Sequence, residues 1–318
     1  MEIDVTNDKL GLGGRVAIVT GAGAGLGRTY ALELAGRGAK VVVNDLGGAI
    51  DGTGSSRSVA DKVVNEIKKL GGQAVPSYDN VANLAGGERI TEIALEAFGS
   101  VDIVVNNAGI LRDKSFIKMA PENWDAVVAV HLTGAYNVTR PAFKIMKKKG
   151  YGRIVMTTSS AGLHGNFGVS NYSAAKMGLV GLMNVLKLEG AKNNIKVNTI
   201  APMAVSRLAA GQKLPDQFEK LKPEFITPMV IYLCSEQCRE SGNIYNAGQG
   251  VFSRTQVLNG TPVVVSDGTT PPTTEEIMAR LDDINNMENS KFYESMPDFF
   301  SDFLGVRRNI LYPKEKRI

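Results

Sequence analysis

Short apolar runs alternate with longer amphipathic stretches over the first 200 residues. The runs are RVAIVT, KVVVND, QAVPSY, VDIVVN, GRIVMT and IKVNTI, which begin at residues 15, 40, 73, 101, 152 and 195. The intervening patterns predict helices over residues 25–37, 58–70, 84–98, 121–148 and 169–192. Apolar strands separated by crossover helices are typical of a parallel sheet with helices on both faces. The pattern therefore predicts an α/β fold with a doubly wound parallel sheet.

The alternation ends after residue 250. The stretch VFSRTQVLNGTPVVV predicts a β-hairpin that turns at Asn259 and Gly260, and SDGTTPPTT predicts a loop. Thr273 and Glu276 form a candidate capping box for the helix EEIMARLDDINNM, and FYESMPDFFSDFLGV predicts a last short helix. We expect one domain over residues 1–259 and a C-terminal extension over 260–318. Its aromatic stripe favours packing on the core or on a partner subunit over a lid above a long apolar substrate.

Composition narrows the class of protein. A chain of 318 residues with 43% hydrophobic residues has enough apolar surface for a large core. The net charge of +4 comes from scattered lysines and from the runs KIMKKKGYGR and PKEKRI, which are typical of solvated faces. We therefore expect no nucleic-acid partner.

Only two cysteines occur, Cys234 and Cys238, and no further metal-ligand candidates cluster near them. This pattern favours neither a disulfide framework nor a zinc site, so no metal is expected. The N-terminal residues lack a basic start followed by an apolar run, and no run of eighteen apolar residues occurs. We expect no membrane span and a cytoplasmic location.

A glycine-rich turn lies between the first strand and the first helix. The sequence TGAGAGLG places Gly21, Gly25 and Gly27 where a backbone can approach a pyrophosphate at the positive end of a helix. Asp45 ends the next strand, and no arginine directly follows it. A carboxylate there binds the ribose hydroxyls of NAD and repels the extra phosphate of NADP, so NAD is the expected cofactor. The alternative is that Asp45 only caps the following loop.

A tyrosine and a lysine lie four positions apart in VSNYSAAKMG, residues 169–178. Residues i and i+4 share one face of a helix, so Lys176 should lie close to Tyr172. A free tyrosine has a pKa near 10, and a nearby ammonium lowers it. We therefore expect Tyr172 to be a general base with a pKa lowered by Lys176. The alternative is a chance pair on a helix surface.

These motifs, together with NNAG at residues 106–109 and Ser159, resemble the short-chain dehydrogenase/reductase family in type and order over residues 10–250. The stretches VVVNDLGG, NNAGILRDKSF, VHLTGAYNVTR and HGNFGVSNYSAAKMGLVGL are similar to the (3R)-hydroxyacyl-CoA dehydrogenase branch found in peroxisomal multifunctional enzymes. The resemblance implies a Rossmann domain and NAD-dependent oxidation of (3R)-3-hydroxyacyl-CoA to 3-ketoacyl-CoA in fatty acid β-oxidation. It also implies a homo-oligomer, either a homodimer or a tetramer.

Alternative functions stay open at this point. One is action on another secondary alcohol or ketone: a steroid, an alicyclic or aromatic acyl-CoA, or a 3-oxoacyl thioester of acyl carrier protein in the reverse direction. Another is a scaffold that binds the cofactor without turnover. The presence of Ser159, Tyr172 and Lys176 together argues against a scaffold.

The resemblance also implies roles for single residues. Catalysis would rest on Ser159, Tyr172 and Lys176. The cofactor would contact Gly21, Gly25, Leu26, Gly27, Asp45, Asp79, Asn80, Val81, Asn106, Asn107, Ala108, Gly109, Tyr172, Lys176 and Pro202. His131 stands where most members of the family have an asparagine. We expect it to be a packed or surface residue, and the alternative is a catalytic role. We expect His164 to be a wall of the substrate pocket.

Overall fold

The computed structural model describes the backbone of residues 8–204 and 221–311 and side chains as far as residue 305. The chain divides into two compact units, Met1–Thr255 and Gln256–Ile318. Each unit is described by itself.

The first unit is built on one large sheet. Within the described residues it has eight strands in the order β3-β2-β1-β4-β5-β6-β7-β8. Their bounds are β1 Val16–Thr20, β2 Lys40–Asn44, β3 Gln73–Ser77, β4 Ile103–Asn106, β5 Gly152–Thr157, β6 Ile195–Pro202, β7 Ile244–Gly248 and β8 Val251–Thr255. All neighbours pair in parallel except β7 and β8. The predicted doubly wound parallel sheet is confirmed.

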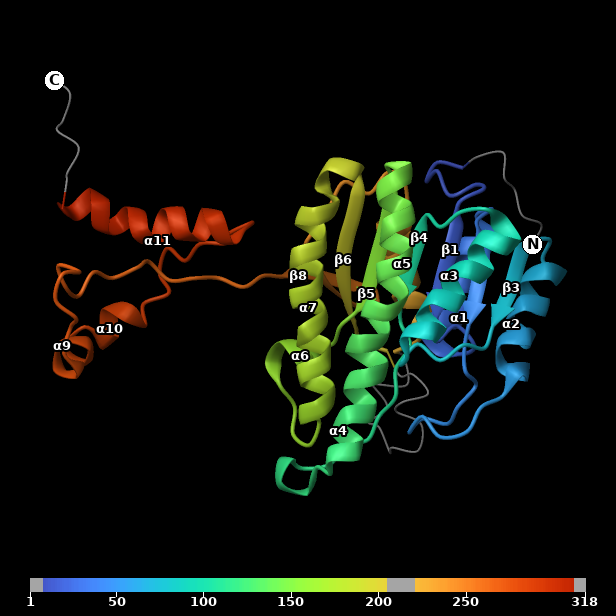
Figure 1. Cartoon of the computed structure of the whole chain (residues 1–318), viewed down its shortest axis with the longest axis horizontal. Helices are drawn as coiled ribbons and strands as arrows, with labels where there is room; N and C mark the ends of the chain where they lie inside the picture. The colour runs from blue at the N-terminus through green and yellow to red at the C-terminus, as the bar shows by residue number, and fades with distance from the viewer. Residues whose placement is uncertain (1–7, 205–220, 312–318) are drawn as a thin grey trace. The chain divides into compact units, whose positions relative to one another are not determined.

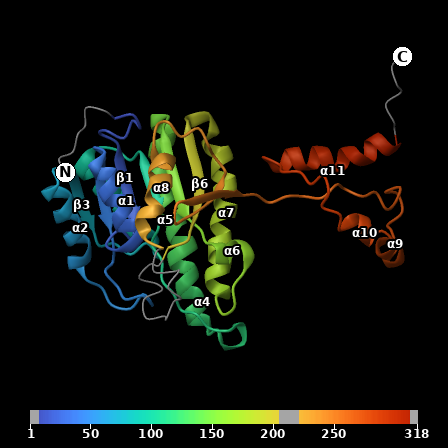
Figure 2. The same ribbon diagram turned by 180° about the vertical axis from the view of Figure 1, so that it is seen from behind.

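Helices cover both faces of the sheet. Their bounds are α1 Gly25–Gly36, α2 Arg57–Lys69, α3 Leu84–Phe98, α4 Pro121–Val128, α5 Gly134–Lys149, α6 Ser160–His164, α7 Ser170–Gly190 and α8 Thr227–Cys234. Figure 1 shows the face covered by α3, α5 and α7, and Figure 2 shows the face covered by α1, α2 and α8. Successive residues of one strand serve opposite faces: Val41 and Val43 pack in the core under α1 and α2, and Val42 packs in the core under α3 and α5.

The helix predicted over residues 121–148 is interrupted. A π turn, Ala129–Thr133, joins α4 to α5, and the flanking residues keep helical dihedral angles. Wide turns of this kind often occur at functional sites because they change the direction of the side chains they carry. This turn carries His131, which is buried.

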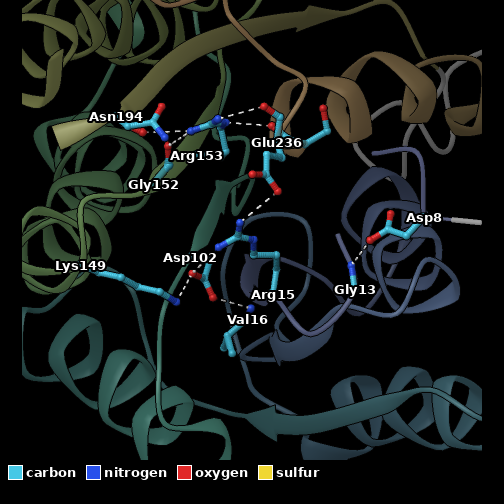
Figure 3. A network of polar contacts seen from close by, with 11 residues as sticks. Asp8, Gly13, Arg15, Val16, Asp102, Lys149, Gly152, Arg153, Asn194 and Glu236 are labelled. Atoms are coloured by element: carbon cyan, nitrogen blue, oxygen red, sulfur yellow. Dashed lines mark hydrogen bonds and ion pairs between the residues drawn. The ribbon is translucent and has the colours of Figure 1, made fainter. Parts of the chain in front are cut away.

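Polar side chains at the starting edge of the sheet form a paired network (Figure 3). The carboxylate of Asp102, just before β4, accepts a hydrogen bond from the Val16 amide at 2.9 Å and pairs with Lys149 and Arg15. The buried guanidinium of Arg153 donates to the carbonyl oxygens of Gly152, Asn194, Ser235 and Glu236. These bonds join the starts of β1, β4, β5 and β6 to the end of α8.

The predicted hairpin at Asn259 and Gly260 is wrong. The antiparallel hairpin consists of β7 and β8, and its turn is Gln249 and Gly250, with φ of 50° and 79°. Two positive φ angles in a two-residue loop match the twist of the strands, and a glycine such as Gly250 adopts a positive φ without strain. Asn259 instead forms an isolated antiparallel bridge with Lys291.

The second unit contains two short helices and one longer helix within the described residues. They are α9 Thr274–Ala279, α10 Leu281–Ile284 and α11 Met296–Leu311. The predicted capping box is confirmed: the Thr273 side chain accepts from the Glu276 amide, and the Glu276 side chain accepts from the Thr273 amide. Across residues 8–204 and 221–311, no helix combines the length and the apolar character needed to cross a bilayer.

Candidate active site

The glycine-rich turn connects β1 to α1, and each glycine serves a different need. A Cβ on Gly27 would lie 2.2 Å from the Gly21 carbonyl oxygen, and one on Gly21 would lie 2.8 Å from the Ala108 Cα. These two glycines therefore permit close backbone packing. Gly25 has a φ of 53°, begins α1 and has no atom within 4 Å of an ideal Cβ. It leaves open space at the positive end of the helix, which fits the close approach of a pyrophosphate.

Asp45 follows β2 and is buried, with 7% of its surface exposed. One carboxylate oxygen accepts from the Gly23 amide at 2.8 Å, and the other accepts from the Gly47 amide at 2.7 Å. Asp45 therefore caps the neighbouring loops, as the alternative interpretation predicted. A carboxylate oxygen has two acceptor sites, so each oxygen can also accept from a ribose hydroxyl. The residues present fit a dinucleotide.

Two adjoining clefts contain most of the predicted site residues. The larger has a volume of about 430 Å³ and the smaller about 240 Å³, and Gly21, Asp45 and Gly109 line both. The larger cleft is also lined by Gly25, Leu26, Asn107, Ser159, Tyr172, Lys176 and Pro202. The smaller cleft is also lined by Asp79, Asn80, Val81 and Ala108. The nucleotide motif and the tyrosine-lysine pair thus share one continuous site.

Two predicted cofactor residues, Gly27 and Asn106, line neither cleft. Gly27 is buried within α1. The Asn106 side chain turns inward and donates to the Thr139 hydroxyl at 2.8 Å. Its neighbour Asn107 holds the glycine turn, because its side-chain amide donates to the carbonyl oxygens of Thr20 and Gly21.

The three predicted catalytic residues come together in the larger cleft. Ser159 caps α6, and its hydroxyl accepts from the Ala161 amide at 3.2 Å. Tyr172 and Lys176 lie one turn apart on α7. The Lys176 ammonium is buried, donates to the Thr157 carbonyl oxygen at 2.5 Å and lies 5.4 Å from the centroid of the Tyr172 ring.

The expectation that Lys176 lowers the pKa of Tyr172 does not hold in this structure. Burial raises the pKa of Tyr172, a hydrogen bond with Ser159 opposes this effect, and the charge of Asp113 adds to it. Burial also lowers the pKa of Lys176 to about 7. The physical reason is that one water-poor pocket disfavours the charged form of both groups. At neutral pH the phenol is therefore protonated.

Residues that the sequence analysis did not identify complete this end of the site. Asp113 lines the larger cleft, and its charge acts on Tyr172. A single aspartate in a loop gives no sequence signal. Thr157 contributes a backbone carbonyl, which every residue possesses. His131 is buried against Tyr172, as expected of a packing residue, with ring centroids 5.1 Å apart. His164 is exposed and lines neither cleft, so its predicted place in a pocket wall is wrong.

Comparison with known proteins gives consistent family matches. The family model described as short chain dehydrogenase matches residues 15–217. A protein of Mycobacterium tuberculosis named as a short-chain type dehydrogenase/reductase is 50% identical over 284 residues, which are 88% of this chain and 97% of that protein. Peroxisomal multifunctional enzyme type 2 of Mus musculus is 49% identical over 277 residues, which are 87% of this chain and 37% of that enzyme.

Solved structures agree with these matches. Full-length peroxisomal multifunctional enzyme type 2 from Drosophila melanogaster superposes with a TM-score of 0.80 at 40% identity, covering 95% of this chain and 51% of that one. A short chain dehydrogenase from Mycobacterium avium superposes with a TM-score of 0.75 at 37% identity, covering 86% of this chain and 95% of that one. The chain therefore spans about half or less of these two multifunctional enzymes.

Proposed function

The chain belongs to the short-chain dehydrogenase family, and from this premise we propose that it oxidises (3R)-3-hydroxyacyl-CoA to 3-ketoacyl-CoA with NAD. One observation carries the proposal: a cleft that fits a dinucleotide at Gly25 and Asp45 continues to Ser159, Tyr172 and Lys176. The thioester substrate rests on the sequence resemblance to the (3R)-hydroxyacyl-CoA dehydrogenase branch, and the similarity to peroxisomal multifunctional enzymes agrees with it. Our proposal includes a homo-oligomer, which light scattering of the purified protein would test.

Each residue has a separate task in the proposed reaction. Ser159 donates a hydrogen bond to the substrate oxygen and holds it beside the phenol. Tyr172 in its ionised form takes the hydroxyl proton as the hydride leaves the same carbon. Gly25 and Asp45 would hold NAD, which would supply the hydride acceptor and a positive charge that favours the phenolate. Lys176, held by the Thr157 carbonyl, lies behind the phenol as a second proton-carrying group with a pKa of about 7.

The proposed preference for NAD rests on the immediate surroundings of Asp45. Its carboxylate is fixed by two backbone amides. Among the described residues that line the two clefts, the one arginine is Arg112, and its Nε donates to the Asp51 carbonyl oxygen. A second phosphate on the ribose would face this carboxylate. NADP should therefore bind more weakly than NAD.

A second candidate function is the reverse reaction, reduction of a 3-ketoacyl thioester at the same site. It is favoured by the raised pKa of Tyr172, because a protonated phenol is suited to donate to a ketone oxygen. Initial rates measured in both directions near neutral pH would decide which direction this site performs faster.

The direct test offers (3R)- and (3S)-3-hydroxybutyryl-CoA separately to the full chain, with NAD or NADP, and follows the absorbance of the reduced cofactor. We expect turnover of the (3R) thioester, with a kcat/KM at least about tenfold higher with NAD, equivalent to about 1.4 kcal/mol. Turnover of the (3S) thioester alone, or of neither, would overturn the proposed substrate.

A further inference from the structure

His131 lies between two spaces in the first unit. It lines the larger cleft and also a small chamber behind it, whose walls include Asn106 and Lys176. Its ring meets Tyr172 edge to face at 85°. A Cβ on Gly109 would lie 2.4 Å from the imidazole Cε1, so the Gly109 backbone packs directly on the ring. The imidazole therefore contacts both the phenol and the loop after β4.

One ring nitrogen of His131 is bonded to the backbone. Nε2 lies 3.0 Å from the Ile110 nitrogen and 2.8 Å from the Ile110 oxygen. In a neutral imidazole, a given nitrogen either accepts or donates. If Nε2 carries the proton and donates to the Ile110 oxygen, it cannot accept from the Ile110 amide, and that amide has no acceptor on His131. If Nε2 accepts from the Ile110 amide, that buried donor is satisfied and Nδ1 carries the proton.

The small chamber has room for a hydrogen-bond partner of Nδ1. Among the described residues, neither His131 Nδ1 nor Asn106 Oδ1 has a hydrogen-bond partner, and both atoms are buried. The chamber has a volume of about 10 Å³, close to the space that one water needs. A water there would accept from Nδ1–H and donate to Asn106 Oδ1, which satisfies both atoms at once.

We propose that His131 is a positioning residue, held as the neutral Nδ1–H tautomer by the Ile110 amide and by a water bound beside Asn106. In this tautomer its ring fixes the direction of the Tyr172 phenol and of the Gly109 backbone. Lys176 is the charged group that faces it, and both burial and this charge keep the pKa of His131 well below its usual value. The effect on turnover rests on the proposed function, but the tautomer does not.

The tautomer can be measured without turnover. The chain has two histidines, so ¹⁵N-histidine NMR of the full protein gives two ring systems, and a His164→Gln variant assigns them. We expect the His131 Nδ1 to show a protonated shift and Nε2 an unprotonated shift, unchanged between about pH 5.5 and 8.5. An Nε2–H tautomer, or titration near the ordinary histidine value, would overturn the proposal.

Substitution tests the positioning role. His131→Ala should lower kcat with the thioester about 30-fold, because small displacements of a reacting group are costly. The KM for NAD should change little. The melting temperature should fall because the buried Ile110 amide loses its acceptor, so kcat is given per folded protein. His131→Gln restores an acceptor for the Ile110 amide and should return kcat to within about fivefold of native. His164→Ala, on the exposed turn of α6, is the matched control and should have native kcat.

Two outcomes would contradict the positioning role. One is a kcat of His131→Ala within about twofold of native. The other is a loss in kcat that follows the unfolded fraction and is not recovered in His131→Gln. If the native protein turns over no 3-hydroxyacyl thioester, the proposed function fails, and the NMR result still decides the tautomer.

Discussion

The charged groups at the starting edge of the sheet, where the strands begin, are paired. Two polar side chains at the finishing edge, where the same strands end, are not fully paired. At the starting edge, both carboxylate oxygens of Asp102 and all guanidinium nitrogens of Arg153 have a partner. At the finishing edge, Asn106 and Thr157 each keep a buried side-chain oxygen without a partner among the described residues. β4 runs from just after Asp102 to Asn106, and β5 runs from Gly152 to Thr157.

This difference separates stability from function. A satisfied buried network holds strand starts together, and removing one member leaves the others unpaired. Unpaired polar atoms weaken the folded state but retain the capacity to bind a ligand or water. The comparison predicts that substitutions at the starting edge change the free energy of unfolding. Substitutions at the finishing edge should change rate, cofactor choice and pH dependence.

The largest effect is expected at the finishing edge. Tyr172→Phe removes the group that exchanges the substrate proton and should lower kcat about 10³-fold, equivalent to about 4 kcal/mol. The ring and its contact with His131 remain, so NAD binding and the melting temperature should be native. Steady-state kinetics and calorimetry measure these quantities. Retained turnover would mean that another group transfers the proton.

At the starting edge we expect a substitution to lower the free energy of unfolding and to leave kcat unchanged. Arg153→Met removes the side-chain donor from four carbonyl oxygens, of which those of Asn194 and Ser235 keep a backbone donor. It should lower the free energy of unfolding by about 3 kcal/mol. The folded fraction should keep a native kcat. Denaturant unfolding gives the free energy of unfolding, and activity per folded protein gives kcat. Arg153→Lys, which keeps the charge, should cost less, and a specific loss of kcat would break the proposed separation of the two edges.

Asp45→Asn tests the nucleotide end of the same edge. Loss of the carboxylate charge should reduce the ratio of NAD to NADP affinity about tenfold, or about 1.4 kcal/mol, because repulsion of the extra phosphate disappears. Isothermal titration with each nucleotide measures the ratio. An unchanged ratio would remove Asp45 as the source of cofactor choice.

The smallest effect is expected from Asp113→Asn. The charge of Asp113 raises the pKa of Tyr172, so its removal should lower that pKa. The limb of the kcat/KM profile that requires the ionised phenol should then shift to lower pH, by about half a unit. Asp125→Asn, at an exposed position on α4, is the matched control and should leave the profile unchanged. A shift to higher pH would contradict the assigned direction.

Local patterns predicted the parts of the molecule that depend on local backbone. The alternation of strands and helices, the turn at Gly21 to Gly27 and the Thr273 capping box all follow from residue types a few positions apart. The prediction of the hairpin was wrong because the sequence offers two candidate turns that contain glycine. The strand that pairs with β8 is β7, which precedes it in the chain.

The chemistry of the pair on α7 could not be predicted in the same way. The spacing of Tyr172 and Lys176 correctly places them together, but the direction of their pKa shifts depends on burial by β5, α6 and the loop after β4. Likewise, the sequence gives no sign of the π turn that directs His131 at the phenol. These are properties of tertiary packing.

The central claim is that burial at the finishing edge, rather than the neighbouring ammonium, sets the acidity of Tyr172. ¹³C-tyrosine NMR of the protein alone tests it directly, with the nine tyrosines resolved by a Tyr172→Phe variant. We predict that Tyr172 ionises above the ordinary value near 10, and that Lys176→Met shifts it by less than about half a unit. Ionisation below that value, together with a clear rise in Lys176→Met, would contradict the account.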